Sequence, residues 1–216
     1  MPSEELPSWN NGPAKTAILD FVAGVTQEGG PDHVRPADRI ATFDNDGTLW
    51  CEQPLQVQFS FARQRLHDMV ARDPGLAQRQ PFKAYVEQDM AAIEAAGKRG
   101  LFEVGAAVHA GVTEEAFDRM ARDWLAQAKH PTLGRRFTEL VYVPQLELIA
   151  YLQKHGFQVF IVSGGGIDLM RAFSEEVYQI PRHHVIGSSV KTRFEIQEDV
   201  GQLVKLAELN TFDDRE

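Results

Sequence analysis

The chain has 216 residues, of which 43% are hydrophobic and 25% charged, and its formal net charge is −9. This composition is typical of a folded globular protein, and the negative charge argues against a general affinity for nucleic acid or for an anionic membrane. The single cysteine, Cys51, excludes an internal disulfide and a cysteine-rich zinc site, and no apolar run is long enough to predict a membrane-spanning helix.

Residues 1–13 are polar and rich in proline, so we expect them to form a flexible N-terminal arm. They lack the basic and apolar regions of a secretory signal, which predicts a cytoplasmic protein; a signal peptide already removed is the alternative. Apolar side chains at helical spacing then predict a helix over residues 14–27, before the helix-breaking sequence Gly-Gly-Pro at residues 29–31.

Residues 39–43 are a short, largely apolar run, which predicts a buried strand of a parallel sheet. The sequence Asp-Asn-Asp-Gly-Thr follows at residues 44–48. Asp44 is therefore expected at the carboxyl end of the strand, where open α/β sheets bind their ligands. Two carboxylates this close are costly unless a cation or a substrate requires them. An acidic β-turn is the purely structural alternative.

The segment between Cys51 and Leu133 has a different character, since its apolar residues recur at helical intervals and glycine and proline interrupt them. It predicts helices over residues 57–71, 82–96 and 101–110, and a fourth that Thr113 caps. We therefore interpret residues 52–133 as an all-helical insertion. The alternative is that these helices belong to one larger α/β core.

A second strand and loop follow the helical segment. Proline near the start and glycine after the end predict a helix over residues 144–155, and residues 157–162 form another short apolar run. That predicted strand leads into Ser-Gly-Gly-Gly at residues 163–166 and then into a predicted helix over residues 167–178. Free backbone N–H groups and a hydroxyl in such a loop are suited to bind a phosphate group.

The sequence at residues 44–48 resembles the Asp-x-Asp-Gly-Thr motif of the haloacid dehalogenase-like hydrolase superfamily, and Ser163-Gly164 resembles its second motif. Across residues 39–190 the pattern looks most like the phosphoserine phosphatase-type branch. The resemblance implies an α/β fold with a Rossmann-like parallel-sheet core, built from residues 14–51 and 134–216. It also implies that residues 52–133 are a helical cap that covers the site and selects the substrate.

The resemblance implies a Mg²⁺-dependent phosphatase that hydrolyses a small phosphorylated metabolite. Asp44 would be the nucleophile that forms an aspartyl-phosphate, and Asp46 the group that protonates the leaving oxygen and then activates water. Asp44 and the backbone carbonyl of Asp46 would bind Mg²⁺, while Ser163 and Gly164 would bind the phosphoryl oxygens. Asp46 favours a phosphatase over a dehalogenase, because a halide leaves without a proton.

The superfamily has two further motifs, a lysine and a later acidic pair that binds the metal. Lys191 and Lys205 are candidates for the lysine, although we favour their being solvated surface charges. Asp213 and Asp214 form an acidic pair in the right order, but residues 207–212 before them lack the apolar run of a buried strand. We therefore interpret the chain as a C-terminally truncated phosphatase; a shortened arrangement that uses these residues is the alternative.

Two other functions are compatible with the same residues. The first is a non-catalytic or weakly active remnant of a phosphatase, which a chain without the later motifs would be. The second is a phosphotransferase or mutase, which differs from a phosphatase only in the acceptor that the cap admits. The scattered histidines, His109 among them, are interpreted as surface or core residues.

Overall fold

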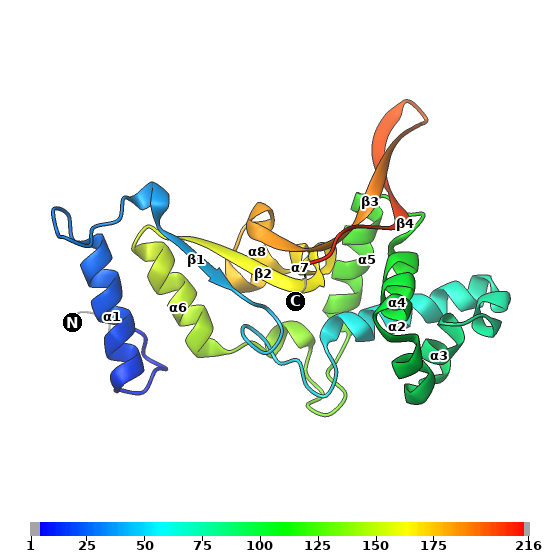
Figure 1. Cartoon of the computed structure of the whole chain (residues 1–216), viewed down its shortest axis with the longest axis horizontal. Helices are drawn as coiled ribbons and strands as arrows, with labels where there is room; N and C mark the ends of the chain where they lie inside the picture. The colour runs from blue at the N-terminus through cyan, green and yellow to red at the C-terminus, as the bar shows by residue number, and fades with distance from the viewer. Residues whose placement is uncertain (1–4, 214–216) are drawn as a thin grey trace.

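The computed structural model describes residues 5–213, apart from the side chain of Lys98. Its helices, in chain order, are α1 (Pro13–Thr26), α2 (Val57–Arg72), α3 (Phe82–Glu87), α4 (Met90–His109), α5 (Glu114–Gln127), α6 (Val143–Lys154), α7 (Ile167–Arg171) and α8 (Ser174–Tyr178). Its strands are β1 (Ile40–Phe43), β2 (Gln158–Gly166), β3 (Val185–Gln197) and β4 (Val200–Thr211). Short 3₁₀ helices lie at Pro36–Asp38, Pro74–Gln78, Phe137–Glu139 and Arg182–His184. Figure 1 shows an elongated molecule with α1 at one end and α2, α3 and α4 at the other.

The strands form one sheet in the order β1-β2-β3-β4. β1, β2 and β3 are parallel, which confirms the predicted α/β fold with a parallel core, whereas β4 runs antiparallel to β3 and makes the sheet mixed. Phe43 lies opposite Ile161, and Ser163 lies opposite Gly187. Asp44, directly after β1, and Ser163, near the carboxyl end of β2, therefore lie at the same end of the sheet. The strand predicted to end at residue 162 continues through the glycines to Gly166.

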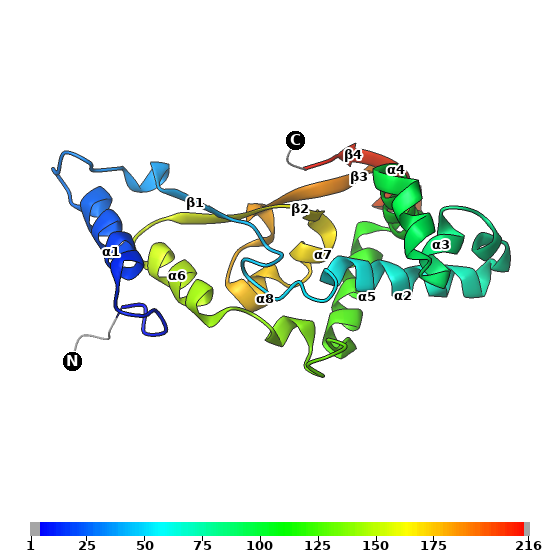
Figure 2. The same cartoon turned by 60° about the horizontal axis from the view of Figure 1, so that its bottom comes forward.

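Helices α6, α7 and α8 cover one face of the sheet, as Figure 2 shows. Their apolar side chains bury that face, so that Ile149 of α6 and Ile161 of β2 are almost completely excluded from solvent. On strands β1 and β3, by contrast, Ile40 and Ile186 remain 59% and 48% exposed. Within residues 5–213 the sheet is thus packed from one side, whereas a doubly wound domain would cover both faces.

The first part of the helical segment between β1 and α6 has a small hydrophobic core of its own, made of Leu66, Leu76, Phe82, Val104 and Val108, whereas α5 packs into the main core. Its helix boundaries differ from those predicted. α3 ends at Glu87, where the next residue adopts a left-handed conformation (φ 57°), and α4 continues through position 97 as a kinked helix. The glycine expected to end a helix at residue 97 instead allows the kink, with φ 56°.

Residues 5–12 lie against α6. Leu6 is buried, the backbone N–H and the hydroxyl of Ser8 both donate to the Glu147 carboxylate, and Trp9 donates from its indole nitrogen to the Pro144 carbonyl. Residues 1–4 of the predicted arm lie outside the described residues, as does Asp214. No helix in the described part of the chain is long and apolar enough to cross a membrane.

Strands β3 and β4 form a long hairpin that projects from the body of the molecule (Figure 1). The two-residue turn consists of Glu198 and Asp199, both with positive φ, which is the geometry that joins tightly twisted antiparallel strands. Residues 207–211, which lack the apolar run of a buried strand, complete β4 because they pair with β3; Leu209, for example, lies opposite Val190. Backbone pairing rather than burial defines this strand.

Candidate functional site

The loop after β1 is held in shape by the buried residue Asn45. Its backbone carbonyl accepts hydrogen bonds from the N–H groups of Thr48 (3.1 Å) and Leu49 (2.8 Å), and its side-chain oxygen accepts one from the Tyr178 hydroxyl (3.1 Å). Gly47 adopts φ 74°, a conformation that is unfavourable for other residues. Because the residue between them is fixed in this way, the two neighbouring aspartates have a defined position.

Asp44 and Asp46 have different surroundings. Asp44 is exposed, and its Oδ1 accepts a hydrogen bond from the backbone N–H of Asn45 at 2.7 Å. Asp46 is partly buried, and its Oδ1 accepts one from the Trp50 indole at 2.8 Å. Burial raises the pKa of Asp46, the Trp50 hydrogen bond lowers it, and the charges of Asp44 and Glu52 raise it further. Asp46 thus retains a proton at higher pH than an ordinary aspartate does, which suits a general acid.

Residues 163–166 (Ser-Gly-Gly-Gly), which form the last part of β2 and are called the glycine loop below, lie beside Asp46. A Cβ atom at Gly165 would lie 3.5 Å from Ser163 Oγ, 3.7 Å from Asp46 Oδ2 and 3.3 Å from Gln58 Oε1. Three polar side chains therefore lie close to this glycine, and a side chain at this position would crowd them. Ser163 Oγ also accepts a hydrogen bond from the Gly165 N–H at 3.3 Å. The structure thus brings Asp46 and Ser163, which are 117 positions apart in the sequence, to the same small space.

Gln58 belongs to this loop, although sequence reasoning missed it. It lies in the second position of α2, and its Oε1 accepts a hydrogen bond from the Gly166 N–H at 2.9 Å. The contact joins the helical segment to the glycine loop across 108 residues. Nothing in the local sequence distinguishes this glutamine from other polar residues of an amphipathic helix, so only the tertiary structure identifies it.

The α-carbon of Gly164 faces Asp213, the member of the predicted acidic pair that the structure describes. A Cβ atom there would be 2.9 Å from the Asp213 carbonyl oxygen, which is too close for any side chain. Ser188 Oγ links the two segments, since it donates to the Gly164 carbonyl (2.9 Å) and accepts from the Asp213 N–H (3.1 Å). Within the described residues the buried Asp213 Oδ2 has no hydrogen-bond partner.

The two candidate lysines differ in exposure. Lys191 is exposed and pairs with Glu208 at 2.9 Å, as expected of a surface charge. Lys205 is only 3% exposed, and its Nζ lies 2.8 Å from Asp168 Oδ1 and 5.5 Å from the centre of the Phe117 ring. The interpretation of Lys205 as a solvated surface charge is therefore wrong. A lysine on a mostly exposed hairpin is buried here because α5 and α7 pack against it.

His109, at the end of α4, lies close to the glycine loop, and no sequence signal indicated this. Its Nδ1 is 2.6 Å from the Gly105 carbonyl, its ring stacks on Phe117, and its Nε2 would lie 4.0 Å from a Cβ atom at Gly166. Burial lowers the pKa of His109, against the opposing effect of the hydrogen bond to Gly105. The ring is thus neutral at neutral pH, with Nδ1 as donor and Nε2 directed toward the loop.

The first loop has suitable donors for Mg²⁺. This ion prefers oxygen ligands, keeps several waters and commonly uses one or two carboxylates together with a substrate phosphate. Burial is the main cause of the raised pKa of Asp46, but the charges of Asp44 and Glu52 also raise it, and a cation would relieve their repulsion of Asp46. Among residues 5–213 no group of three or more Asp, Glu, His or Cys side chains is arranged to enclose a metal ion, so Asp213 does not complete such a site.

The chain was compared with solved structures, with curated proteins and with sequence models of protein families. A phosphoserine phosphohydrolase-like protein from Francisella tularensis subsp. tularensis SCHU S4 is similar over 80% of this chain, with 18% identity and a TM-score of 0.38. A functionally unknown protein from Anaerococcus prevotii DSM 20548 is similar over 92%, with 13% identity and a TM-score of 0.34. The chain spans 64% and 63% of those two structures, and no curated protein matches it. The sequence model of the haloacid dehalogenase-like hydrolase family matches residues 41–208, and the chain therefore belongs to that family.

Proposed function

We propose that the protein is a Mg²⁺-dependent phosphomonoesterase that forms an aspartyl-phosphate on Asp44. The observation that carries the proposal is the convergence of Asp46 Oδ2 and Ser163 Oγ beside Gly165, where a Cβ atom would lie within 3.7 Å of both. Hydrolysis of a phosphate ester requires a proton donor for the leaving oxygen and hydrogen-bond donors for the phosphoryl oxygens. Asp46 can supply the proton, and the Ser163 hydroxyl can bind a phosphoryl oxygen. Family membership supports a hydrolase, and Asp46 favours phosphate esters among its substrates.

The residues have distinct roles in the proposed reaction. Exposed Asp44 attacks phosphorus in line with the leaving oxygen. Asp46, whose pKa is raised, donates its proton to that oxygen and then accepts a proton from the water that hydrolyses the aspartyl-phosphate. Ser163 Oγ and the Gly164 N–H bind the phosphoryl oxygens and stabilise the charge that they carry in the transition state.

The Asp44 carboxylate and the Asp46 backbone carbonyl would hold Mg²⁺. When bound, the ion neutralises charge on the transferring phosphoryl group and reduces the repulsion between the phosphate and the nucleophile.

We further propose that residues 52–133 act as a cap over a core formed by residues 14–51 and 134–216. The helical segment supports this division because it contains its own hydrophobic cluster around Leu66 and Val104. Gln58 binds the glycine loop directly, so the helical segment contacts the phosphate site and is positioned to select the substrate. We expect that substrate to be a small phosphorylated metabolite.

Phosphate release from p-nitrophenyl phosphate, with Mg²⁺ and with EDTA, tests the proposal. We expect Mg²⁺-dependent turnover that Asp44→Asn abolishes. Asp38→Asn is a matched control, because Asp38 is an aspartate outside the site that pairs with Arg35 at 2.7 Å. Turnover that survives in Asp44→Asn contradicts the mechanism. A folded wild-type chain without turnover contradicts the proposed activity and supports a non-catalytic remnant instead.

A further inference from the structure

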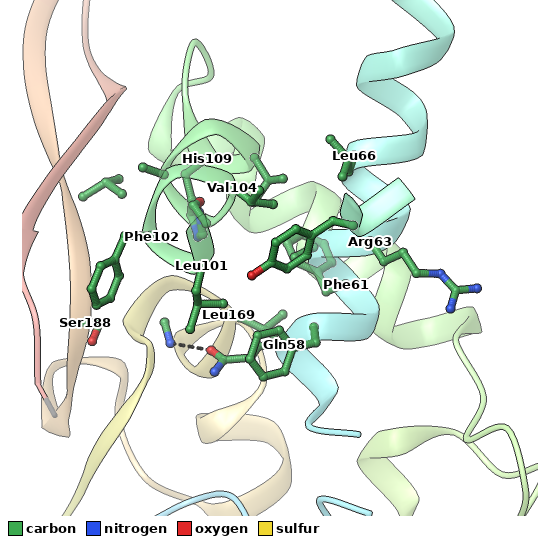
Figure 3. A pocket seen from close by; sticks show the side chains of 18 of the residues that line it. Gln58, Phe61, Arg63, Leu66, Leu101, Phe102, Val104, His109, Leu169 and Ser188 are labelled. Atoms are coloured by element: carbon green, nitrogen blue, oxygen red, sulfur yellow. Dashed lines mark hydrogen bonds between the residues drawn. The ribbon is translucent and has the colours of Figure 1, made fainter. Parts of the chain in front are cut away.

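A cavity of about 520 Å³ lies between the helical segment and the glycine loop. Helices α2 and α4 form its walls, and the β3–β4 hairpin, with Ser188, closes one side (Figure 3). Gly164 and Gly166 of the glycine loop also line it. Gln58 lines the cavity, and its Oε1 also faces the space at Gly165 that Asp46 Oδ2 and Ser163 Oγ surround. The cavity therefore lies directly beside the proposed phosphate site.

Most side chains that line this cavity are apolar. They include Phe61, Leu66 and Val104, which are almost fully buried, together with Leu101 and Phe102. Figure 3 shows them around the space from α2 on one side and α4 on the other. The ring of Phe102 packs edge-on against Phe212, with the ring centres 4.4 Å apart, so that aromatic groups also flank the hairpin side. A volume of this size accommodates the greater part of a small organic ligand.

The charged side chains of the lining already have partners. Among the described residues that line the cavity, these are Asp168, which pairs with buried Lys205 at 2.8 Å, and Arg63, which is exposed at the rim and donates to Gln88 at 3.2 Å. His109 contributes a neutral ring. A ligand with a free ammonium and carboxylate group, such as an amino-acid phosphate, would leave those charges without partners, which is unfavourable in an apolar cavity.

We propose that this cavity binds an apolar leaving group, and that the substrate is therefore a phosphate monoester of an alkyl or aryl alcohol. The inference rests on the proposed function, because it assigns the phosphoryl group to the adjacent glycine loop. Each methylene that moves from water into the cavity favours binding by about fourfold, from the usual free energy of burying a CH₂ group.

Gly105 offers a substitution that reduces the cavity. It lies on α4, it lines the cavity, and a Cβ atom at this position meets no other atom within 4 Å. The side chain of Gly105→Leu therefore has open space to enter and takes volume from the ligand. Gly24 on α1 is a matched control, because it is also a helical glycine with open space around a new Cβ atom but lies outside the cavity.

The test compares kcat/KM for methyl, butyl and octyl phosphate and for O-phospho-L-serine. We expect kcat/KM to rise by about fourfold for each methylene until the cavity is full. The octyl-to-methyl ratio should fall by about tenfold or more in Gly105→Leu, equivalent to the loss of two methylenes, and should be unchanged in Gly24→Leu. Equal values along the alkyl series, or a preference for phosphoserine, would overturn the inference.

Binding of non-hydrolysable phosphonates separates this inference from the proposed function. If no ester is hydrolysed, the proposed activity fails, and titration calorimetry with octylphosphonate and methylphosphonate then tests the cavity alone. Tighter binding of octylphosphonate, weakened in Gly105→Leu, supports the apolar site. Equal binding of the two phosphonates, or an octylphosphonate affinity that Gly105→Leu leaves unchanged, overturns it.

Discussion

Replacement of Lys205 by methionine should destabilise the protein strongly. The change removes a buried ammonium group and leaves the Asp168 carboxylate, whose side chain is only 18% exposed, without its partner. Breaking a buried pair in this way typically costs 3–5 kcal/mol. We expect about 3 kcal/mol, at the lower end, because water still reaches part of Asp168. With a urea m-value of about 2–3 kcal/mol/M, the midpoint of unfolding should fall by about 1 M or more.

A double-mutant cycle completes this test. Combining Lys205→Met with Asp168→Asn removes both charges, so the double variant should be more stable than the sum of the single effects predicts, by about 1–3 kcal/mol. Lys191→Met is the control, since Lys191 forms an exposed pair and should cost less than about 1 kcal/mol. A similarly small cost for Lys205→Met, accompanied by a large fall in kcat, would refute the structural role and indicate a phosphate-binding lysine instead.

Three further predictions concern groups around the two loops. Asp46→Asn should raise the melting temperature of the metal-free protein at pH 7 but not near pH 4. The pKa of Asp46 is raised on folding, so the folded protein loses stability as the pH increases through that pKa and the carboxyl ionises. An unchanged or lower melting temperature at pH 7 would contradict this. Tyr178→Phe should cost about 1–3 kcal/mol in urea unfolding, since it leaves the buried Asn45 side-chain oxygen without its donor, and a cost near zero would show that the bond is dispensable. His109→Gln should reduce the stability that the protein loses between pH 7 and pH 5. The pKa of His109 is lowered on folding, so the unfolded chain binds a proton more readily than the folded protein as the pH falls. An identical pH dependence of stability in the variant would exclude that contribution.

The strand-and-loop units of the fold could be predicted because their signals are local. A short apolar run predicted both strands, although none of the β1 residues is fully buried and β2 continues beyond the predicted end, through the glycines to Gly166. Parallel pairing then places both ends at one sheet edge, and the structure shows that pairing between β1 and β2. The aspartate motif therefore indicated both the family and the position of the first loop in the sheet.

The contacts that support the site could not be predicted, because they join distant segments. Gln58 reaches Gly166 across 108 residues, and Tyr178 reaches Asn45 across 133. Neither residue differs locally from many other glutamines or tyrosines. Lys205 is a similar case, since a lysine in an alternating strand is usually exposed, and only packing against α5 and α7 reveals that it is buried.

The most direct test of the account is to identify the phosphorylated residue. The protein is mixed with p-nitrophenyl phosphate and Mg²⁺, quenched in acid and digested, and its peptides are examined by mass spectrometry. The account predicts a phosphate adduct on the peptide that contains Asp44, lost on treatment with hydroxylamine and absent from Asp44→Asn. An adduct on another residue, or phosphate release with no adduct at any quench time, would contradict nucleophilic catalysis by Asp44.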